Sequence, residues 1–175
     1  SRIRRTRWLH KFFSLIDFKY GFRDKYTGFK IFIYWYRDLP FLLSSNYIFE
    51  KEVRRAIILI AKLENISKFW DVGANIGYYS FLISDLMPKS EITAFEPLKK
   101  NIDVLTRTIH YKKIKNISLT GKAVSNKTGI EKYVIDDFSG ATSQFLSLIR
   151  KYDEYWIENA YGLRKSVEVE IIIFM

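Results

Sequence analysis

The sequence predicts one α/β domain, built around a parallel sheet and preceded by an extension. Three observations predict this class. Strand-like and helix-like patterns alternate beyond residue 47, a turn with two glycines follows one strand, and an acid ends the next strand. The chain has 175 residues, of which 48% are hydrophobic, and this is enough for one core.

The extension, residues 1–46, carries most of the positive charge. Residues 1–37 hold ten Lys and Arg against two acids, so eight of the ten net charges lie there. Arginines alternate with aromatic and aliphatic residues over 1–18, a pattern that fits a basic amphipathic helix touching anionic lipid or nucleic acid. The alternative is a solvated arm that packs one apolar side on its own domain. The segment FKIFIYWY, at 29–36, is typical of a strand.

A helix, a strand and a second helix are predicted next. Apolar residues recur at steps of three and four over 47–63, which indicates a helix. The strand KFWDV follows at 68–72, and Pro88 ends the helix that begins near Tyr78. The residues expected to face the core are Phe49, Val53, Ile57, Ile60 and Leu63 in the first helix, and Tyr78, Phe81, Leu82 and Leu86 in the second.

Two more strands flank a third helix. The strand EITAFEP lies at 91–97, and Pro97 suits the first position of the following helix. A strand at 116–125 comes next, with a break at Gly121. The resulting βαβαβ order builds one half of a doubly wound sheet. The third helix is expected to bury Leu98, Ile102, Leu105 and Ile109.

The turn in FWDVGANIGYYS, residues 69–80, lies where such sheets bind ligands, beyond the carboxyl ends of the strands. A strand that stops at Asp71 and turns through Gly73 to a helix at Gly77 would point several backbone N–H groups at one spot. Glu96 ends the neighbouring strand 25 residues after Asp71, close to the spacing at which an acid accepts hydrogen bonds from ribose hydroxyls. The pattern therefore predicts a nucleoside site.

Several classes of chemistry are excluded or made difficult by composition. The chain has no cysteine, which excludes disulfides, thiolate zinc sites and cysteine nucleophiles. His10 and His110 are the only histidines, so a metal site or a Ser-His-Asp triad is hard to assemble, and we expect no metal. No apolar run reaches the roughly 18 residues of a spanning helix. We therefore expect a soluble, cytoplasmic protein whose basic arm can lie at a membrane surface.

The motifs DVGANIGYYS, ITAFEP, AVSNKTG and SGATS resemble those of the FkbM family of S-adenosylmethionine-dependent methyltransferases. The resemblance runs from about Tyr47 to about Val169. It implies a Rossmann-like methyltransferase fold, a three-layer sandwich, over residues 47–175. It also implies S-adenosylmethionine as cofactor, and transfer of a methyl group to a hydroxyl of a small molecule, sugar or glycan.

The resemblance also implies roles for the residues of the turn. Asp71, Gly73, Asn75 and Gly77 would cradle the methionine part of the cofactor, with Asp71 near its ammonium group. Glu96 would bind the ribose hydroxyls. Two alternatives stay open, because Asp71 can simply fix the turn and Glu96 can be an acid favoured by the dipole at a helix N-terminus.

Further positions are implied around the adenosine part. Phe95 and Pro97 would flank the sugar or adenine, with a core role as the alternative for Phe95. Lys122 and Ala123 occupy the position at which the family places the edge of the adenine.

No catalytic residue is identified by the sequence. Asp136, Asp137 and His110 are candidates for a general base, and solvated surface groups are the alternative for each. The polar turn at 139–143 matches a small-residue loop of the family. Aromatic and aliphatic residues at helical spacing over 144–161, beginning with Phe145, predict a helix that packs on the core.

The chain departs from the family at its end. Family members continue into further strands, whereas this sequence reads SVEVEIIIFM and stops, so we expect the C-terminal half of the fold to be missing. The fourth parallel strand is then absent or is formed by residues 167–174, whose apolar edge invites self-association. Two rival functions remain. One is an RNA methyltransferase or RNA-binding module that uses the basic arm, and the other is a non-catalytic nucleoside-binding remnant that a partner completes.

Overall fold

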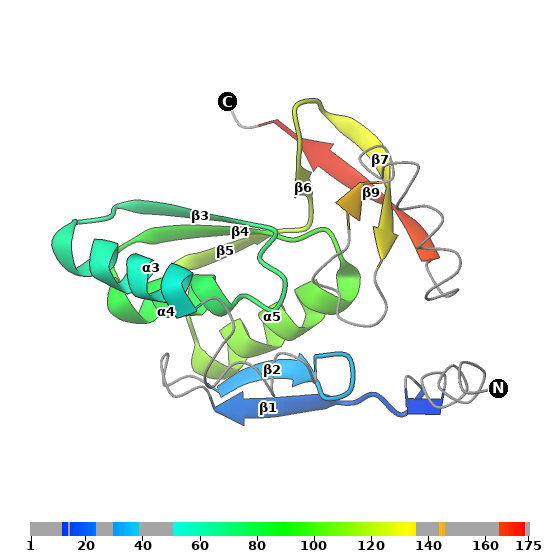
Figure 1. The fold of residues 1–175 in the computed structure, drawn as a ribbon, viewed down its shortest axis with the longest axis horizontal. Coiled ribbons are helices and arrows are strands. Elements are labelled where there is room, and N and C mark those ends of the chain that lie inside the picture. The colour runs from blue at the N-terminus through cyan, green and yellow to red at the C-terminus, as the bar shows by residue number, and fades with distance from the viewer. Residues whose placement is uncertain are drawn as a thin grey trace.

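The computed structural model describes residues 12, 13, 15–23, 30–38, 51–135, 144–145 and 165–173, with only the backbone described at 144, 145, 165 and 166. The described strands form three sheets, which are a two-stranded hairpin, a three-stranded sheet and a four-stranded sheet. Figure 1 shows the three-stranded sheet above a layer of helices, with the hairpin beneath that layer. The predicted α/β class is confirmed.

The three-stranded sheet is parallel and holds β3 (Lys68–Val72), β4 (Glu91–Phe95) and β5 (Ile117–Thr120), in that spatial order. Helix α4 (Tyr78–Leu86) connects β3 to β4, and α5 (Lys99–Lys112) connects β4 to β5. Two crossovers of one hand that step in the same direction across a sheet place both helices on the same face. Figure 1 shows this arrangement, so the third layer is the hairpin and not a second set of helices.

The core lies between this sheet and its helices. Phe81 on α4, Ile92 on β4 and Leu105 on α5 are almost fully buried in one cluster. The predicted buried face of α5 is confirmed, since Leu98 is buried and Ile102 and Ile109 are half-buried. On the side of the sheet away from the helices, Trp70 and Val72 of β3 are about half exposed.

Helix α3 (Lys51–Leu63) packs on α4, but the face predicted for it is wrong. Val53, Ile60 and Leu63 are 49%, 50% and 72% exposed, whereas Arg54 is buried. Ile57, the remaining described residue of that face, does pack against the core. The run AIILIA from residue 56 places apolar groups on most sides of the helix, so the periodicity could not select the face that meets α4.

The extension contributes directly to the core. Strands β1 (Lys19–Arg23) and β2 (Lys30–Tyr34) form an antiparallel hairpin, and Ile31 and Ile33 are fully buried in the same cluster as α5. The predicted strand in the extension is confirmed, and β1 was not predicted. Residues 12, 13 and 15 are helical, and the rest of the predicted arm helix lies outside the described residues.

The four-stranded sheet holds β6 (Ala123–Val124), β7 (Gly129–Ile135), β8 (Gln144–Phe145) and β9 (Lys165–Ile172). Their spatial order is β6-β9-β7-β8, in which β9 is parallel to β6 and antiparallel to β7. Of the two alternatives for a fourth strand of the parallel sheet, its formation by residues 167–174 is wrong for the described part, because those residues pair in this other sheet. Phe145 lies in a strand and not in the predicted helix, most of which falls outside the described residues. The predicted break at Gly121 is confirmed, since the chain there leaves β5 for the other sheet.

Among the described residues, none of the helices combines the length and the apolar character that crossing a membrane would require.

Candidate functional site

The loop after β3 turns sharply because three of its residues have left-handed backbone conformations. Gly73, Asn75 and Gly77 have φ angles of 73°, 51° and 82°. At Gly77 a Cβ atom would lie 2.1 Å from Leu105 Cδ2 and 2.9 Å from Phe81 Cε2, so only glycine fits between the two helices. At Gly73 a Cβ atom would meet nothing within 4 Å. The loop therefore packs tightly at its helix end and is open at its strand end.

The N–H groups of this loop bind acceptors inside the protein. Those of Gly73 and Ala74 both donate to the Phe95 carbonyl, at 3.0 Å each. The Asn75 N–H donates to Glu96 Oε2 at 2.8 Å, and the Gly77 N–H donates to the Ala74 carbonyl at 2.7 Å. The expectation that these groups point at one open position is therefore wrong. Those of Gly73, Ala74 and Asn75 bind the loop to the end of β4, whereas that of Gly77 closes a turn within the loop.

Glu96 lies at the predicted place, at the end of β4 and directly beside the loop. Its carboxylate is 4% exposed, and it accepts hydrogen bonds from Asn75 N–H and from Leu98 N–H, each at 2.8 Å. Burial raises the pKa of Glu96, and these hydrogen bonds act in the opposite direction. The side chain of Asn101 is a third hydrogen-bond partner of this carboxylate, so about one acceptor position remains. In the structure Glu96 joins the loop to the start of α5, and its contact with ribose stays a prediction.

Asp71 faces α4 and holds the first turn of that helix. Its Oδ2 accepts hydrogen bonds from Ser80 N–H at 2.9 Å and from Ser80 Oγ at 2.6 Å. The N-cap residue of α4 is Gly77, which makes no side-chain cap, so Asp71 supplies the acceptor that this helix end lacks. Burial raises the pKa of Asp71. The observed contacts of Asp71 are those of the alternative in which it fixes the turn. A contact between Asp71 and the ammonium group of the cofactor stays a prediction.

Two buried amide oxygens beside the loop have no hydrogen-bond donor among the described residues. These are Oδ1 of Asn75 and Oδ1 of Asn101, which comes from the first turn of α5. Such atoms favour a partner, because leaving a buried acceptor unsatisfied costs about 1–3 kcal/mol. Together with the open space at Gly73, they are compatible with a polar ligand seated against the loop.

Pro97 and Phe95 flank Glu96 in sequence but differ in exposure. Pro97 is half-buried, whereas Phe95 is buried, as its alternative core role requires. Helix α5 begins at Lys99 with Leu98 as its N-cap, so the expectation that Pro97 is the first helical residue is wrong. Whether Pro97 flanks a sugar or adenine stays a prediction.

Lys122 and Ala123 belong to the connection into the four-stranded sheet. Ala123 is buried against Val169 and Ile171 and pairs with Ile171 in the ladder of β6 with β9. Lys122 Nζ forms an ion pair with Glu170 Oε2 at 2.8 Å. The structure therefore gives both residues contacts in that sheet, and their place at an adenine edge stays a prediction.

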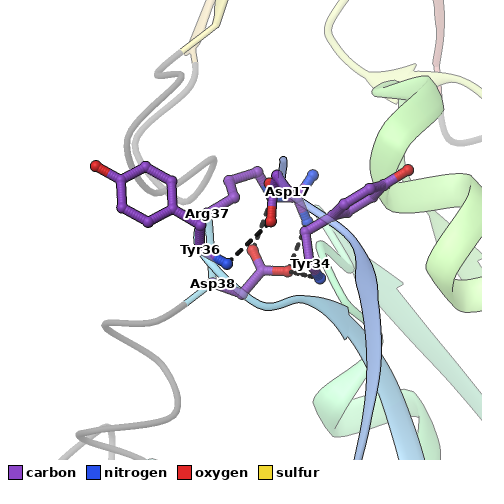
Figure 2. Close-up of polar contacts among 5 residues, drawn as sticks. All are labelled: Asp17, Tyr34, Tyr36, Arg37 and Asp38. Atoms are coloured by element: carbon purple, nitrogen blue, oxygen red, sulfur yellow. Dashed lines mark hydrogen bonds and ion pairs between the residues drawn. The ribbon is translucent and has the colours of Figure 1, made fainter. Parts of the chain in front are cut away.

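A charged cluster at the end of β2, which the sequence reasoning missed, also influences the site. Arg37 Nε and Nη2 donate to Asp38 Oδ1 and Oδ2 at 2.7 and 2.9 Å, and both side chains are buried. Asp38 Oδ2 also accepts the Tyr34 N–H at 2.8 Å, and Asp17 Oδ1 accepts the Tyr36 N–H at 2.9 Å (Figure 2).

Arg37 and Tyr133 both interact electrostatically with Glu96. The positive charge of Arg37 acts to lower the pKa of Glu96, against the larger effect of burial. On β7, burial raises the pKa of Tyr133, and the charge of Glu96 raises it further. The extension and the four-stranded sheet thus both approach the acid at the end of β4. A basic and an acidic residue directly after an apolar strand, as in YRD, is the signal that could have indicated Arg37.

His110, the candidate base within the described residues, does not lie at this site. His110 is exposed in the last turn of α5, eleven residues after the start of the helix, which corresponds to about 16 Å along its axis. Asp136, Asp137 and the turn at 139–143 lie outside the described residues. In the described part of the chain, no three His, Cys, Asp or Glu side chains are grouped closely enough to hold a metal ion.

Neither a scan against protein-family models nor a search of curated proteins found a match for this chain. The resemblance to the FkbM family therefore stays a prediction.

Solved structures that resemble the chain include methyltransferases and a protein described as a putative transferase. The precorrin-6y C5,15-methyltransferase of Geobacter metallireducens is 26% identical over 42% of this chain and 38% of its own, with a TM-score of 0.36. The P. horikoshii TYW2 protein, in complex with MeSAdo, is 14% identical over 88% of this chain and 70% of its own, with a TM-score of 0.43. A Plasmodium falciparum protein described as a protein-L-isoaspartate O-methyltransferase, in complex with S-adenosyl-L-homocysteine, is 20% identical over 39% of this chain and 35% of its own, with a TM-score of 0.33. The chain thus spans little more than a third of the length of the first and third of these proteins.

Proposed function

We propose that the chain binds S-adenosylmethionine between the loop 73–77 and Glu96, as part of a Rossmann-like methyltransferase. One observation carries this proposal. A turn with three left-handed residues ends one parallel strand, and a buried carboxylate at the end of the neighbouring strand is hydrogen-bonded to that turn. In open α/β sheets, ligands bind beyond the carboxyl ends of the strands, where both features lie.

The residues present fit this cofactor. The open space at Gly73 leaves room for the methionine part, and the unsatisfied Oδ1 of Asn75 offers an acceptor for its ammonium group. Glu96 accepts three hydrogen bonds within the protein and keeps about one acceptor position for a ribose hydroxyl. Bound S-adenosylmethionine supplies a methyl group that its sulfonium already activates. The protein then needs mainly to orient the acceptor, an effect worth up to about 7–11 kcal/mol in well-oriented reactions.

For the acceptor, we propose a hydroxyl group of a sugar, glycan or other small molecule. The resemblance of DVGANIGYYS and ITAFEP to the FkbM family supports this choice. None of the described residues next to the loop is assigned as a general base. Binding without turnover, in an acceptor screen, would instead favour the alternative of a nucleoside-binding protein that requires a partner.

Calorimetric titration with S-adenosylhomocysteine tests the proposed cofactor site. We expect saturable binding that Glu96→Ala weakens about tenfold to a hundredfold, as for the loss of hydrogen bonds to a charged group. Glu91→Ala is the matched control, because Glu91 begins the same strand with an exposed side chain. Circular dichroism confirms that each variant is folded. Absence of binding by the folded chain, or equal weakening by both substitutions, would contradict the proposal.

A further inference from the structure

A second cleft lies between the β1–β2 hairpin and the later turns of α5. Its volume is about 720 Å³, and Lys19 and Lys30 from the hairpin and Arg107 and His110 from the helix contribute to its walls. The lining residues of α5 lie between Asp103 and Tyr111, beyond the first turn of the helix that carries Asn101. The cleft is therefore separate from the glycine loop, which contacts the start of the helix.

Acidic charge in this cleft is already neutralised. Among the described residues that line it, Asp103 is the only acid, and Lys19 Nζ contacts Asp103 Oδ2 at 2.5 Å. The Tyr34 hydroxyl donates to the same oxygen at 3.0 Å. The hydrogen bond from Lys19 is the main cause that lowers the pKa of Asp103. Asp103 is thus held as a carboxylate by groups of the protein, and one lysine balances its charge.

Two further cations of the cleft lie against aromatic rings, and one of them, Arg107, also acts by its charge to lower the pKa of Asp103. No ion pair joins Lys30 or Arg107 to an acid within the described part of the chain. Aromatic rings hold both of them. Lys30 Nζ lies 5.4 Å from the centroid of the Tyr111 ring, and Arg107 Cζ lies 4.7 Å from that of Phe32. A ring face orients a cation but does not cancel its charge, so both charges are available to an anion.

The chemistry of these groups favours a phosphate. A guanidinium group presents paired N–H donors that match two phosphate oxygens, and an ammonium group adds a point charge. The Tyr111 side chain is 56% exposed at the rim of the cleft. Exposed aromatic rings beside cations are the arrangement on which unpaired bases stack when single strands bind.

We propose that this cleft binds a nucleotide, with its phosphate on Lys30 and Arg107 and its base against Tyr111. The nucleotide is either free or part of a single-stranded nucleic acid, since both present the same phosphate and base. This site is independent of the proposed cofactor site, so either can exist without the other.

Three probes distinguish the sources of the phosphate: inorganic pyrophosphate, uridine monophosphate and a fluorescent single-stranded oligouridylate. Binding is measured by calorimetry for the first two and by fluorescence anisotropy for the third, at low salt. We expect saturable binding of at least one probe, weakened roughly fivefold or more by Arg107→Gln and by Lys30→Gln. If the oligonucleotide binds, its affinity should fall steeply with salt, and the dependence should become shallower in both variants. Tyr111→Ala should weaken the two nucleotide probes and leave pyrophosphate unchanged.

Lys99→Gln is the matched control, because it removes the same charge from an exposed position in the first turn of α5. Its binding should stay within about twofold of that of the unmodified chain. Binding of S-adenosylhomocysteine should be unchanged in Arg107→Gln, which separates this site from the proposed cofactor site. Equal weakening by Lys99→Gln, no binding of any probe, or binding only to vesicles that contain phosphatidylglycerol would overturn the proposal. If Arg107→Gln fails to fold, Lys30→Gln carries the test.

Discussion

The two ends of α5 hold charge in opposite ways. At its start, the Glu96 carboxylate is buried and hydrogen-bonded by backbone N–H groups of the glycine loop and of Leu98. Beside its later turns, Arg107 of the helix and Lys30 of β2 lie over aromatic rings at the wall of an open cleft. Buried groups with fixed partners contribute to stability, whereas exposed ion pairs contribute little. We therefore expect substitutions at the loop to change folding, and substitutions of the cleft cations to change binding.

The largest effect on stability is expected for a substitution of Gly77, and a substitution of Gly73 in the same loop provides the comparison. Gly77→Ala combines a left-handed backbone with a Cβ atom only 2.1 Å from a buried leucine methyl group, so we expect a loss of about 3 kcal/mol or more. Gly73→Ala meets no neighbouring atom and should lose only the roughly 1–2 kcal/mol of the backbone conformation. Urea unfolding of both variants measures the difference. Similar losses would show that contact with α5 does not determine the glycine at 77.

An intermediate effect is expected where the hairpin joins the helix. Thr108 Oγ1 accepts the Phe32 N–H at 2.9 Å in a buried position, and Thr108→Val would leave that donor without a partner. We expect the free energy of unfolding to fall by about 1–3 kcal/mol. Thr106→Val, an exposed change on the same helix, should have an effect within about 0.5 kcal/mol. If thermal unfolding shows equal losses of stability for Thr108→Val and Thr106→Val, the hairpin does not depend on this hydrogen bond.

The smallest effect is expected for Asp71→Asn, and it should depend on pH. The amide oxygen can still accept from Ser80, so we expect a change below about 1 kcal/mol at neutral pH. Burial raises the pKa of Asp71 above its usual 3.8, so the folded protein holds this proton more tightly than the unfolded chain. The contribution of Asp71 to stability is then complete below pH 3.8 and is lost as the pH rises through the higher folded pKa.

The variant Asp71→Asn lacks this dependence. The free energy of unfolding of the variant, minus that of the unmodified chain, should therefore increase as the pH rises above 3.8. Urea titrations at several pH values provide the comparison. A difference that stays constant with pH would mean that Asp71 has the same pKa in both states.

Much of the framework could be predicted because it depends on local patterns. The glycine turn, the proline after α4 and the spacing of Leu105 and Ile109 each determine structure within a few residues. The exposed face of α3 could not be predicted, because apolar residues surround that helix and only its contact with α4 selects a side. Strand β1 is short and contains two charged residues, and it is a strand because it pairs with β2.

The sequence predicted the places of Asp71 and Glu96 at the ends of two neighbouring strands, but not their hydrogen bonds. The end of β3 and the end of β4 follow from the βαβ order, which placed Asp71 and Glu96 correctly. Their partners, Ser80 and the N–H groups of Asn75 and Leu98, depend on the left-handed conformations of the loop. Arg37 approaches Glu96 only because the hairpin packs on α5, and such a contact between distant segments leaves no periodic signal in the sequence.

The most direct test of the account follows the backbone amide signals of the ¹⁵N-labelled chain by nuclear magnetic resonance during titration with S-adenosylhomocysteine. The account predicts that the signals of residues 73–77, 96 and 98 shift with one common saturation curve, while those of residues 107–111 stay unchanged. Shifts confined to the hairpin and the later turns of α5, or no shifts in the folded protein, would contradict the assignment of the cofactor to the glycine loop.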